Sequence, residues 1–89
     1  MYRVVTTRQF DNDFRQLDND TASRVISKAE WLSNHPESLR FPLKHVPSDL
    51  KGLHKYRIGD YRLLLWVDHD KQVLTLYAVK HRSSIYKNL

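Results

Sequence analysis

Cysteine is absent from this chain of 89 residues. Its absence excludes a disulfide-stapled secreted scaffold, a zinc ribbon and a catalytic thiol, because each of these requires cysteine sulfur. Long apolar runs are also missing: the longest, from Leu63 to Val67, has 5 residues, whereas a membrane-spanning helix needs roughly 20. The N-terminal residues 1–6 are strand-like and contain no signal-peptide core. These absences favour a soluble, cytoplasmic protein.

Glycine occurs twice and proline three times, and no internal repeat or low-complexity tract is visible. Hydrophobic residues make up 40% and charged residues 28% of the chain, which is ordinary usage for a globular domain and argues against extensive disorder. A chain of this length has room for one hydrophobic core. Residues 1–89 are therefore predicted to form a single domain.

Positive charge is concentrated in the second part of the chain. Residues 1–39 carry five basic and six acidic side chains, whereas residues 40–89 carry ten basic and four acidic side chains. The second part therefore holds a net charge of +6 within a total of +5, which is the pattern of a surface that meets a polyanion. The alternative is a charge that serves only solubility.

The first third of the chain predicts a strand and two helices. Residues 2–6 read as a short strand, and Thr6 and Gln9 have the spacing of a helix capping box. The apolar stripe of this first helix is formed by Phe10, Phe14 and Leu17. Residues 18–20 interrupt the pattern, so the two helices are expected to form an αα-hairpin.

The second helix is predicted to begin after Asp20 as its N-cap and to end at Asn34-His35-Pro36. Its apolar face comprises Ala22, Val25, Ile26, Ala29 and Leu32. Residues 37–50 contain two prolines and show no period, so we expect an irregular connection there. This connection bears Arg40, Lys44 and His45.

From Leu53 onward the hydrophobic period becomes that of strands. Residues 53–58 and 61–67 flank Gly59-Asp60, a two-residue connection that predicts a tight hairpin. This turn sets Ile58 opposite Tyr61 and Arg57 opposite Arg62, so that two faces alternate along the strands. One face is expected to hold Tyr56, Ile58, Tyr61, Leu63 and Leu65, and the other Lys55, Arg57, Arg62, Leu64 and Trp66.

A third strand is predicted over residues 73–80, after the polar turn at 68–71. If that turn holds four residues, Arg62 lies opposite Tyr77. Leu74, Leu76 and Ala78 then join the apolar face, and Thr75, Tyr77, Val79 and His81 join the cationic face. A change of one residue in the turn would exchange the two sides.

The cationic face is the part of the sequence that points to chemistry. Arginines directly opposite each other on adjacent strands repel, at a cost of up to ~1 kcal/mol, so the grouping of Lys55, Arg57 and Arg62 is typical of a site that binds an anion. Guanidinium groups suit phosphate, and the neighbouring Trp66 and Tyr77 offer surfaces on which bases could stack. The alternative is that the cations shield a solvent face, with the aromatic rings half-buried between their stems.

Two stretches carry a family resemblance. Residues 52–63, with the sequence GLHKYRIGDYRL, and residues 81–86, with the sequence HRSSIY, together resemble the RelE/ParE superfamily of bacterial and archaeal type II toxins. The chain is similar to that family over nearly its whole length, in the order of strand, helical hairpin and strands. The resemblance implies a small α+β domain with a mostly antiparallel four-stranded sheet and the αα-hairpin packed on one face.

In the RelE-like branch, the resemblance implies an endoribonuclease that cuts messenger RNA in the ribosomal A site without a metal or other cofactor. The substrate's 2′-OH would attack the adjacent phosphate. By position in the motif, Arg62 matches the family's phosphate-stabilising arginine and Tyr86 its catalytic tyrosine, with Arg82 adding positive charge. The substrate-binding residues are expected to be Lys44, Lys51, Lys55, Arg57 and Lys80.

The general acid remains open between two neighbours. Lys80 stands where some members of the family carry an arginine that acts on the leaving group, and lysine lacks the guanidinium fork. In the alternation above, Lys80 turns toward the helices and His81 lies on the open face. His81 is then favoured, because imidazole titrates near neutral pH.

Two other functions share most of these features. A ParE-like toxin would inhibit DNA gyrase without cutting RNA, and a nonenzymatic nucleic-acid-binding module would need the basic face but not His81 and Tyr86. The toxin interpretation also implies a cognate antitoxin made alongside the protein. We expect that partner to be acidic, amphipathic and partly disordered when free, because it must cover a basic domain.

Overall fold

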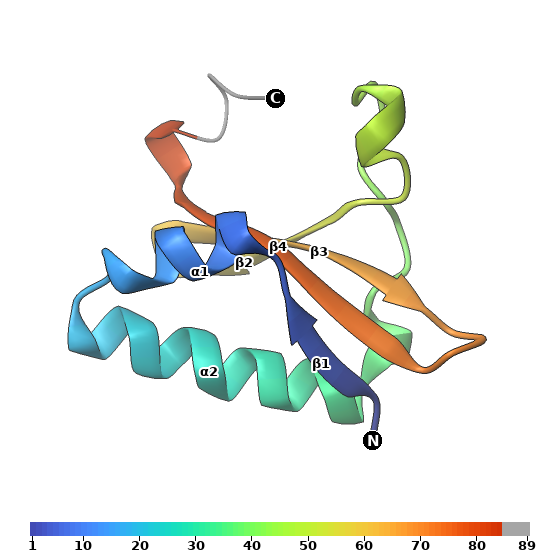
Figure 1. Ribbon diagram of the computed structural model, residues 1–89, viewed down its shortest axis with the longest axis horizontal. Helices are drawn as coiled ribbons and strands as arrows, with labels where there is room; N and C mark the ends of the chain where they lie inside the picture. The colour runs from blue at the N-terminus through green and yellow to red at the C-terminus, as the bar shows by residue number, and fades with distance from the viewer. Residues whose placement is uncertain (85–89) are drawn as a thin grey trace.

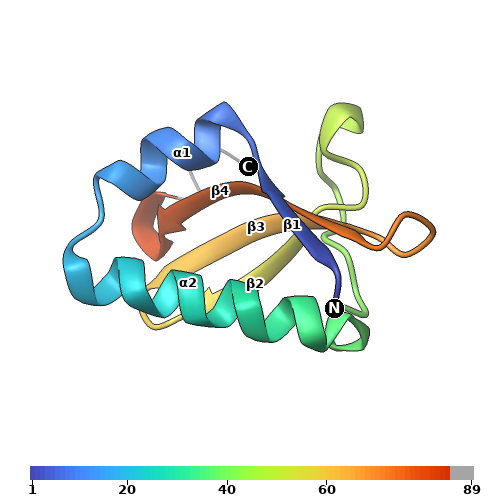
Figure 2. The same ribbon diagram turned by 60° about the horizontal axis from the view of Figure 1, so that its bottom comes forward.

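The computed structural model describes residues 1–84 (Figure 1). The elements are β1 (Arg3–Thr6), α1 (Arg8–Arg15), α2 (Asn19–Asn34), the short 3-10 turns η1 (Pro36–Ser38) and η2 (Ser48–Leu50), β2 (His54–Ile58), β3 (Tyr61–Asp68) and β4 (Val73–His81). The four strands form one sheet in the order β1-β4-β3-β2, in which β1 runs parallel to β4 and the other pairs are antiparallel. The predicted α+β fold is confirmed: Figure 2 shows α1 and α2 together on one face of the sheet.

Both helices begin two residues or less from their predicted caps. Thr7, rather than Thr6, caps α1 by accepting a hydrogen bond from the Phe10 N–H at 3.2 Å. Asp18, rather than Asp20, caps α2 by accepting the Thr21 N–H at 3.0 Å. Each cap therefore uses a different side chain of the same polar stretch. No helix within residues 1–84 is long and apolar enough to span a membrane.

The β2–β3 hairpin has the predicted register. Ile58 pairs with Tyr61, Arg57 with Arg62 and Lys55 with Leu64. Gly59, in the first central position of the turn, has a φ of 58°. This left-handed conformation is open to glycine at little steric cost, so the residue type and the tight turn go together.

The β3–β4 pairing differs from the prediction. Asp68 pairs with Val73, so the strands are shifted by two residues from the predicted register. A shift of two keeps each side chain on its predicted face near the turn. A bulge opposite Leu64 and Leu65 then adds one residue to β4, so Ala78 and Val79 exchange sides and Arg62 pairs with Lys80 instead of Tyr77. The physical reason is that an extra residue reverses the alternation of all side chains beyond it.

The sheet buries apolar side chains on both faces. The larger core lies between the helices and the sheet and includes Phe10, Val25, Leu32, Leu63, Leu74 and Val79. The smaller core lies on the opposite face, where Leu50 and Leu53 cover Leu64 and Ala78. The irregular connection therefore packs back onto the sheet. Ile26, predicted in the apolar face of the second helix, is instead 56% exposed.

Stability should depend on the protonation of His54, which is only 7% exposed on β2. Burial, assisted by the nearby His69, lowers the pKa of His54 below its ordinary value of 6.5. The unfolded chain then binds the proton more strongly than the folded protein does, so stability is full above about pH 6.5 and falls as the pH drops below it. We expect His54→Leu to remove much of the change in thermal unfolding temperature between pH 7.5 and pH 5.5.

The matched control is His45→Asn. His45 is exposed and has a φ of 60°, a conformation that asparagine tolerates, so this variant should keep the pH dependence of the wild type. Equal pH dependence in the wild type and in His54→Leu would contradict the assignment to His54.

Candidate functional site

Three cations lie side by side across the sheet near the β2–β3 turn. Arg57 on β2 pairs with Arg62 on β3, and Arg62 pairs in turn with Lys80 on β4. Directly paired residues project to the same face of a sheet. The structure therefore confirms the predicted juxtaposition of Arg57 and Arg62 and adds Lys80, which the sequence had placed on the helical side.

The Arg62 side chain is held in place by backbone oxygens. Its Nη1 donates to the Gly59 carbonyl at 3.0 Å and to the Tyr61 carbonyl at 2.9 Å. No carboxylate within residues 1–84 lies within 4 Å of its guanidinium. The arginine is thus positioned by neutral acceptors and keeps its positive charge uncompensated, which is what an anion-binding group needs.

Lys80 is positioned by α1. Its Nζ lies 2.9 Å from Asp13 Oδ1, while Asp13 Oδ2 accepts the Val79 N–H at 3.2 Å and Oδ1 also accepts from Gln9 Nε2 at 2.9 Å. The side chains of Lys80 and Asp13 are 27% and 9% exposed. Asp13 is a site residue that the sequence analysis missed, because no local pattern links a helix carboxylate to a strand 67 positions away.

His81 lies on the other face from the one predicted. It pairs with Tyr61, and the two rings meet edge to face with centroids 5.3 Å apart. Its Nδ1 accepts the Ser83 N–H at 3.2 Å and contacts Ser83 Oγ at 2.9 Å. A backbone N–H can only donate, so neutral His81 carries its proton on Nε2. The register position opposite Arg62 that favoured His81 as general acid belongs to Lys80, and the side chains of both residues line one pocket with Asp13 and Tyr61.

The chain after β4 turns back over the hairpin. The Arg82 N–H donates to the Asp60 carbonyl at 2.8 Å, and the Arg82 side chain is exposed. Residues 82–84 form a helical turn that rises from one end of the sheet, while the connection around η2 rises from the other end (Figure 1). Tyr86, the predicted catalytic tyrosine, lies outside the described residues.

The remaining predicted substrate-binding lysines are exposed but are not all gathered at the cationic row. Lys55 pairs with Leu64, two positions along β2 from Arg57. The Lys51 carbonyl accepts a hydrogen bond from Trp66 Nε1 at 3.1 Å. Trp66 is four residues from Arg62 on β3, so Lys51 lies about 13 Å along the strand from Arg62, at ~3.3 Å per residue. Lys44 belongs to the same irregular connection. Lys44 and Lys51 therefore border the open face at a distance from the arginine pair.

Trp66 and Tyr77 have a structural role in the smaller core. Their ring centroids are 5.1 Å apart, and both rings pack against the cluster that Leu50 and Leu53 close. This packing attaches the irregular connection to the sheet. Both rings are half-buried, as the alternative interpretation of the cationic face predicted, and are not freely exposed surfaces for base stacking.

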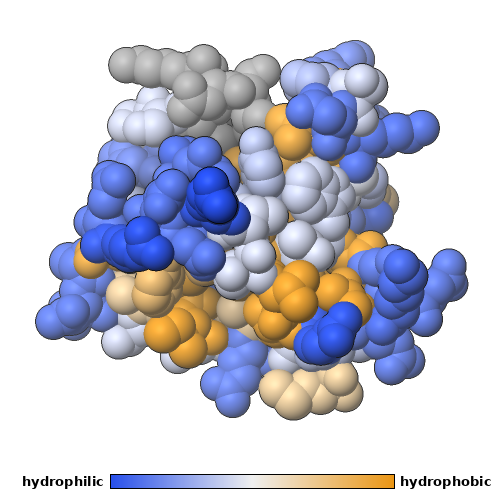
Figure 3. Space-filling view, viewed as in Figure 1, coloured by the Kyte–Doolittle hydropathy of each residue, from blue (hydrophilic) through white to orange (hydrophobic). Residues whose placement is uncertain are grey.

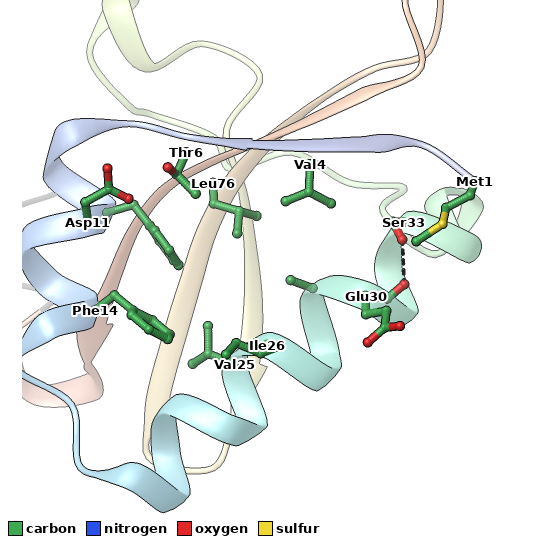
Figure 4. Close-up of a pocket in the computed structure, with 12 residues that line it drawn as sticks. Met1, Val4, Thr6, Asp11, Phe14, Val25, Ile26, Glu30, Ser33 and Leu76 are labelled. Atoms are coloured by element: carbon green, nitrogen blue, oxygen red, sulfur yellow. Dashed lines mark hydrogen bonds between the residues drawn. The ribbon is translucent and has the colours of Figure 1, made fainter.

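An apolar groove on the helical side is a second surface feature, and the sequence did not predict it. The groove has a volume of about 450 Å³ and lies between β1, α1 and α2. Met1, Val4 and Ile26 are 83%, 37% and 56% exposed at its rim. Apolar side chains gather over β1 and α2 in Figure 3, and Figure 4 shows Val4, Phe14 and Ile26 bordering the hollow. The sequence gives no signal for the groove, because the exposure of Ile26 depends on how α2 packs against the sheet.

Comparison with known proteins relates the chain to a family. The profile of the family described as ParE toxin of the type II toxin-antitoxin system parDE matches residues 4–86. Toxin RelE of Mycobacterium tuberculosis (strain H37Rv) is 30% identical over 87 residues, which cover 97% of this chain and 87% of that protein.

Solved structures agree with the sequence matches. The crystal structure of the RelBE2 toxin-antitoxin complex from M. tuberculosis contains a chain that is 29% identical to this one, with a TM-score of 0.76 and coverage of 91% of this chain and 98% of that chain. The isolated E. coli RelE toxin has the same fold, with a TM-score of 0.74 at 16% identity and full coverage of both chains. This chain therefore belongs to the RelE/ParE family of type II toxins.

Proposed function

We propose that this toxin is a metal-independent endoribonuclease that cuts messenger RNA in the ribosomal A site and so inhibits translation in the cytoplasm. The observation that carries the proposal is the row of Arg57, Arg62 and Lys80 across three strands. Similarity to proteins named RelE supports the toxin assignment on which it rests. Three adjacent cations suit a reaction in which negative charge builds up on one phosphate.

The proposed reaction is a transfer within the RNA strand. The 2′ oxygen forms a bond to the adjacent phosphorus, the bond to the 5′ oxygen breaks, and the products are a 2′,3′-cyclic phosphate and a 5′-hydroxyl. A base takes the 2′-OH proton and an acid returns a proton to the 5′ oxygen. In this proposal Tyr86 is the base and Arg57, Arg62 and Arg82 stabilise the charged phosphorane.

Lys80 becomes the preferred acid once the bulge in β4 is taken into account. Its backbone pairs with Arg62, and its side chain extends to Asp13 on α1, where it lines one pocket with Tyr61 and His81. His81 instead packs its ring against Tyr61 and contacts Ser83 through Nδ1. An ammonium group can donate a proton to the leaving 5′ oxygen, and Asp13 at 2.9 Å orients it. His81 is the second candidate for the acid, because its Nδ1 is occupied by Ser83 and its Nε2 carries the proton that it could donate.

Inhibition of DNA gyrase is the second candidate function. It is favoured by the match of residues 4–86 to the profile described as ParE toxin. The two functions differ in their products, because a gyrase inhibitor would leave messenger RNA intact. Two assays separate them: mapping of RNA ends after cell-free translation, and DNA supercoiling by purified gyrase. Cuts at ribosome-defined positions support the endoribonuclease. Intact RNA together with inhibited supercoiling supports the gyrase inhibitor.

We propose a cognate antitoxin as the partner, with an apolar helix or strand seated in the groove between β1, α1 and α2 and acidic side chains over the basic face. Several solved relatives are toxin-antitoxin complexes. The exposure of Met1, Val4 and Ile26 supplies the apolar contact area that such a segment would bury. Association by folding on binding spreads the contact over a large surface.

Arg62→Ala should abolish messenger RNA cleavage while leaving the fold intact. Loss of one donor to the transition state commonly costs ~10²–10³ in rate, and removal of one arginine relieves repulsion with Arg57. Cleavage in cell-free translation and thermal unfolding would be measured together. Arg3→Ala, an exposed cation at the far end of the sheet, is the control for charge loss. Near-wild-type cleavage by folded Arg62→Ala would contradict the proposal.

Lys80→Gln should reduce cleavage by the ~10²–10⁴ typical of general acid–base catalysis, whereas His81→Gln should change it much less. The reason is the register that sets Lys80 beside Arg62. Single-turnover cleavage rates as a function of pH would be compared for both variants, with Lys80→Arg as the charge-preserving control. A larger reduction in His81→Gln than in Lys80→Gln would reverse the assignment of the acid.

Ile26→Glu should weaken neutralisation by the antitoxin and leave toxicity unchanged. Ile26 is 56% exposed at the apolar groove, so a carboxylate there disfavours burial against a partner without disturbing the core. Growth rescue on co-expression with the neighbouring reading frame would be measured. Asn12→Glu, an exposed position on α1 outside the groove, adds the same charge as a control. Full rescue of the Ile26 variant would exclude the groove as the contact site.

A further inference from the structure

A cationic pocket lies between α2 and the β2–β3 turn, away from the apolar groove. Its volume is about 440 Å³. The helix contributes Ser23, Arg24, Ser27 and Lys28, and the hairpin contributes Arg57 and Gly59. None of the four helix residues was singled out by the sequence analysis, which found the first 39 residues slightly acidic.

Helical spacing places the four α2 residues on one strip. Residues four apart along a helix are surface neighbours, so Ser23 and Ser27 stand in one row and Arg24 and Lys28 in the next. The buried face of α2, with Val25, Ala29 and Leu32, points to the core instead. The four residues of the strip are exposed and lie outside this buried face.

The cations of this pocket form no ion pair with a carboxylate of the described residues. Within residues 1–84, no carboxylate lies within 4 Å of Arg24, Lys28 or Arg57. The acidic residues of α2 nearest in sequence are Asp20, four positions before Arg24, and Glu30, two positions after Lys28. The pKa of Asp18, the N-cap of α2, is lowered first by its hydrogen bonds from Thr21 and also by the charge of Arg24. Three cations without a close ion pair to any described carboxylate, together with two hydroxyl donors, form a group that suits a phosphate.

The Gly59 turn connects this pocket to the candidate active site. Arg24 Nη1 lies 3.3 Å from the position that a Cβ would take on Gly59. From the other side, Arg62 Nη1 donates to the Gly59 carbonyl at 3.0 Å. Arg57 lines the pocket and pairs with Arg62. Arg24, Arg57 and Arg62 thus lie around the Gly59-Asp60 turn, between α2 and the open face.

We propose that the pocket formed by Arg24, Lys28, Ser23 and Ser27 binds a backbone phosphate of the RNA strand, one that neighbours the phosphate held by Arg57 and Arg62. This inference rests on the proposed function, because it extends the path of the same RNA. Contacts to phosphate carry no sequence information and position the strand. The pocket therefore sets where the RNA lies across the hairpin and leaves base selection to other contacts.

The test measures binding of a single-stranded RNA oligonucleotide by fluorescence anisotropy over a range of salt concentrations. Arg24→Gln/Lys28→Gln should bind more weakly and show a smaller salt dependence. The slope of log K against log salt should fall by about 0.7 for each phosphate that the variant no longer binds. Arg3→Gln/Lys71→Gln removes the same charge at the opposite end of the sheet and should retain most of the slope. Thermal unfolding checks the fold of each variant.

A second variant tests the pocket without removing its cations. Ser27→Asp places a carboxylate beside Arg24 and Lys28, so it should compete with the phosphate and weaken RNA binding to a similar extent. Equal slopes for the pocket and control double variants, or wild-type affinity in Ser27→Asp, would overturn the proposal, as would failure of the wild type to bind the oligonucleotide.

The outcome can be separated from that of the proposed function. If the pocket variants weaken RNA binding but the wild type never cuts messenger RNA in cell-free translation, the phosphate site stands and the endoribonuclease activity falls. If the wild type cuts messenger RNA and the pocket variants bind and cut as the wild type does, the activity stands and the phosphate site falls.

Discussion

The single extra residue in β4 determines the arrangement of the candidate site. β4 pairs with β1 in parallel at one end and with β3 along its length, and α1 lies against its other end. Without the bulge opposite Leu64 and Leu65, the alternation set near Leu74 and Leu76 would direct Ala78 into the helical core and Lys80 away from Arg62. With it, Val79 enters that core and Lys80 joins the arginine pair. Bulges reorient the side chains that follow them in this way.

Repulsion among Arg57, Arg62 and Lys80 opposes folding, and the structure offsets it locally. Asp13 neutralises Lys80 from the helical layer, and the Gly59 and Tyr61 carbonyls receive the Arg62 guanidinium. Lys80 is therefore ion-paired and half-buried, whereas Arg57 and Arg62 have no ion pair with a described carboxylate. A phosphate that binds there would supply the negative charge that the fold itself leaves out.

The two faces of the molecule suit different partners. The open face carries the cationic row and is partly covered by the connection that packs Leu50 and Leu53 on the sheet. The helical face carries the apolar groove, bordered by Val4 and Ile26. Because these surfaces do not coincide, a partner that occupies the groove can be held tightly by apolar contact and reach the cations with a separate acidic segment. The cationic pocket on α2 lies between the two surfaces.

Local patterns in the sequence determined much of the fold. The Gly59-Asp60 turn set the register of β2 and β3, helical periodicity located both helices, and two short motifs indicated the family. These features depend on residues that are close in the chain, where spacing translates directly into geometry. The pairing of Arg57 with Arg62 was predicted for that reason.

Only the tertiary structure decided which residues accompany that pair. A bulge depends on how two strands fit their other neighbours, so the exchange of Lys80 and His81 has no local signature. The contact of Asp13 with Lys80 spans 67 positions, and the approach of Arg24 to Gly59 joins a helix to a turn that is far along the chain. Contacts of this kind arise from the packing of whole elements, which composition and periodicity do not encode, and they place the charges on which the proposed chemistry depends.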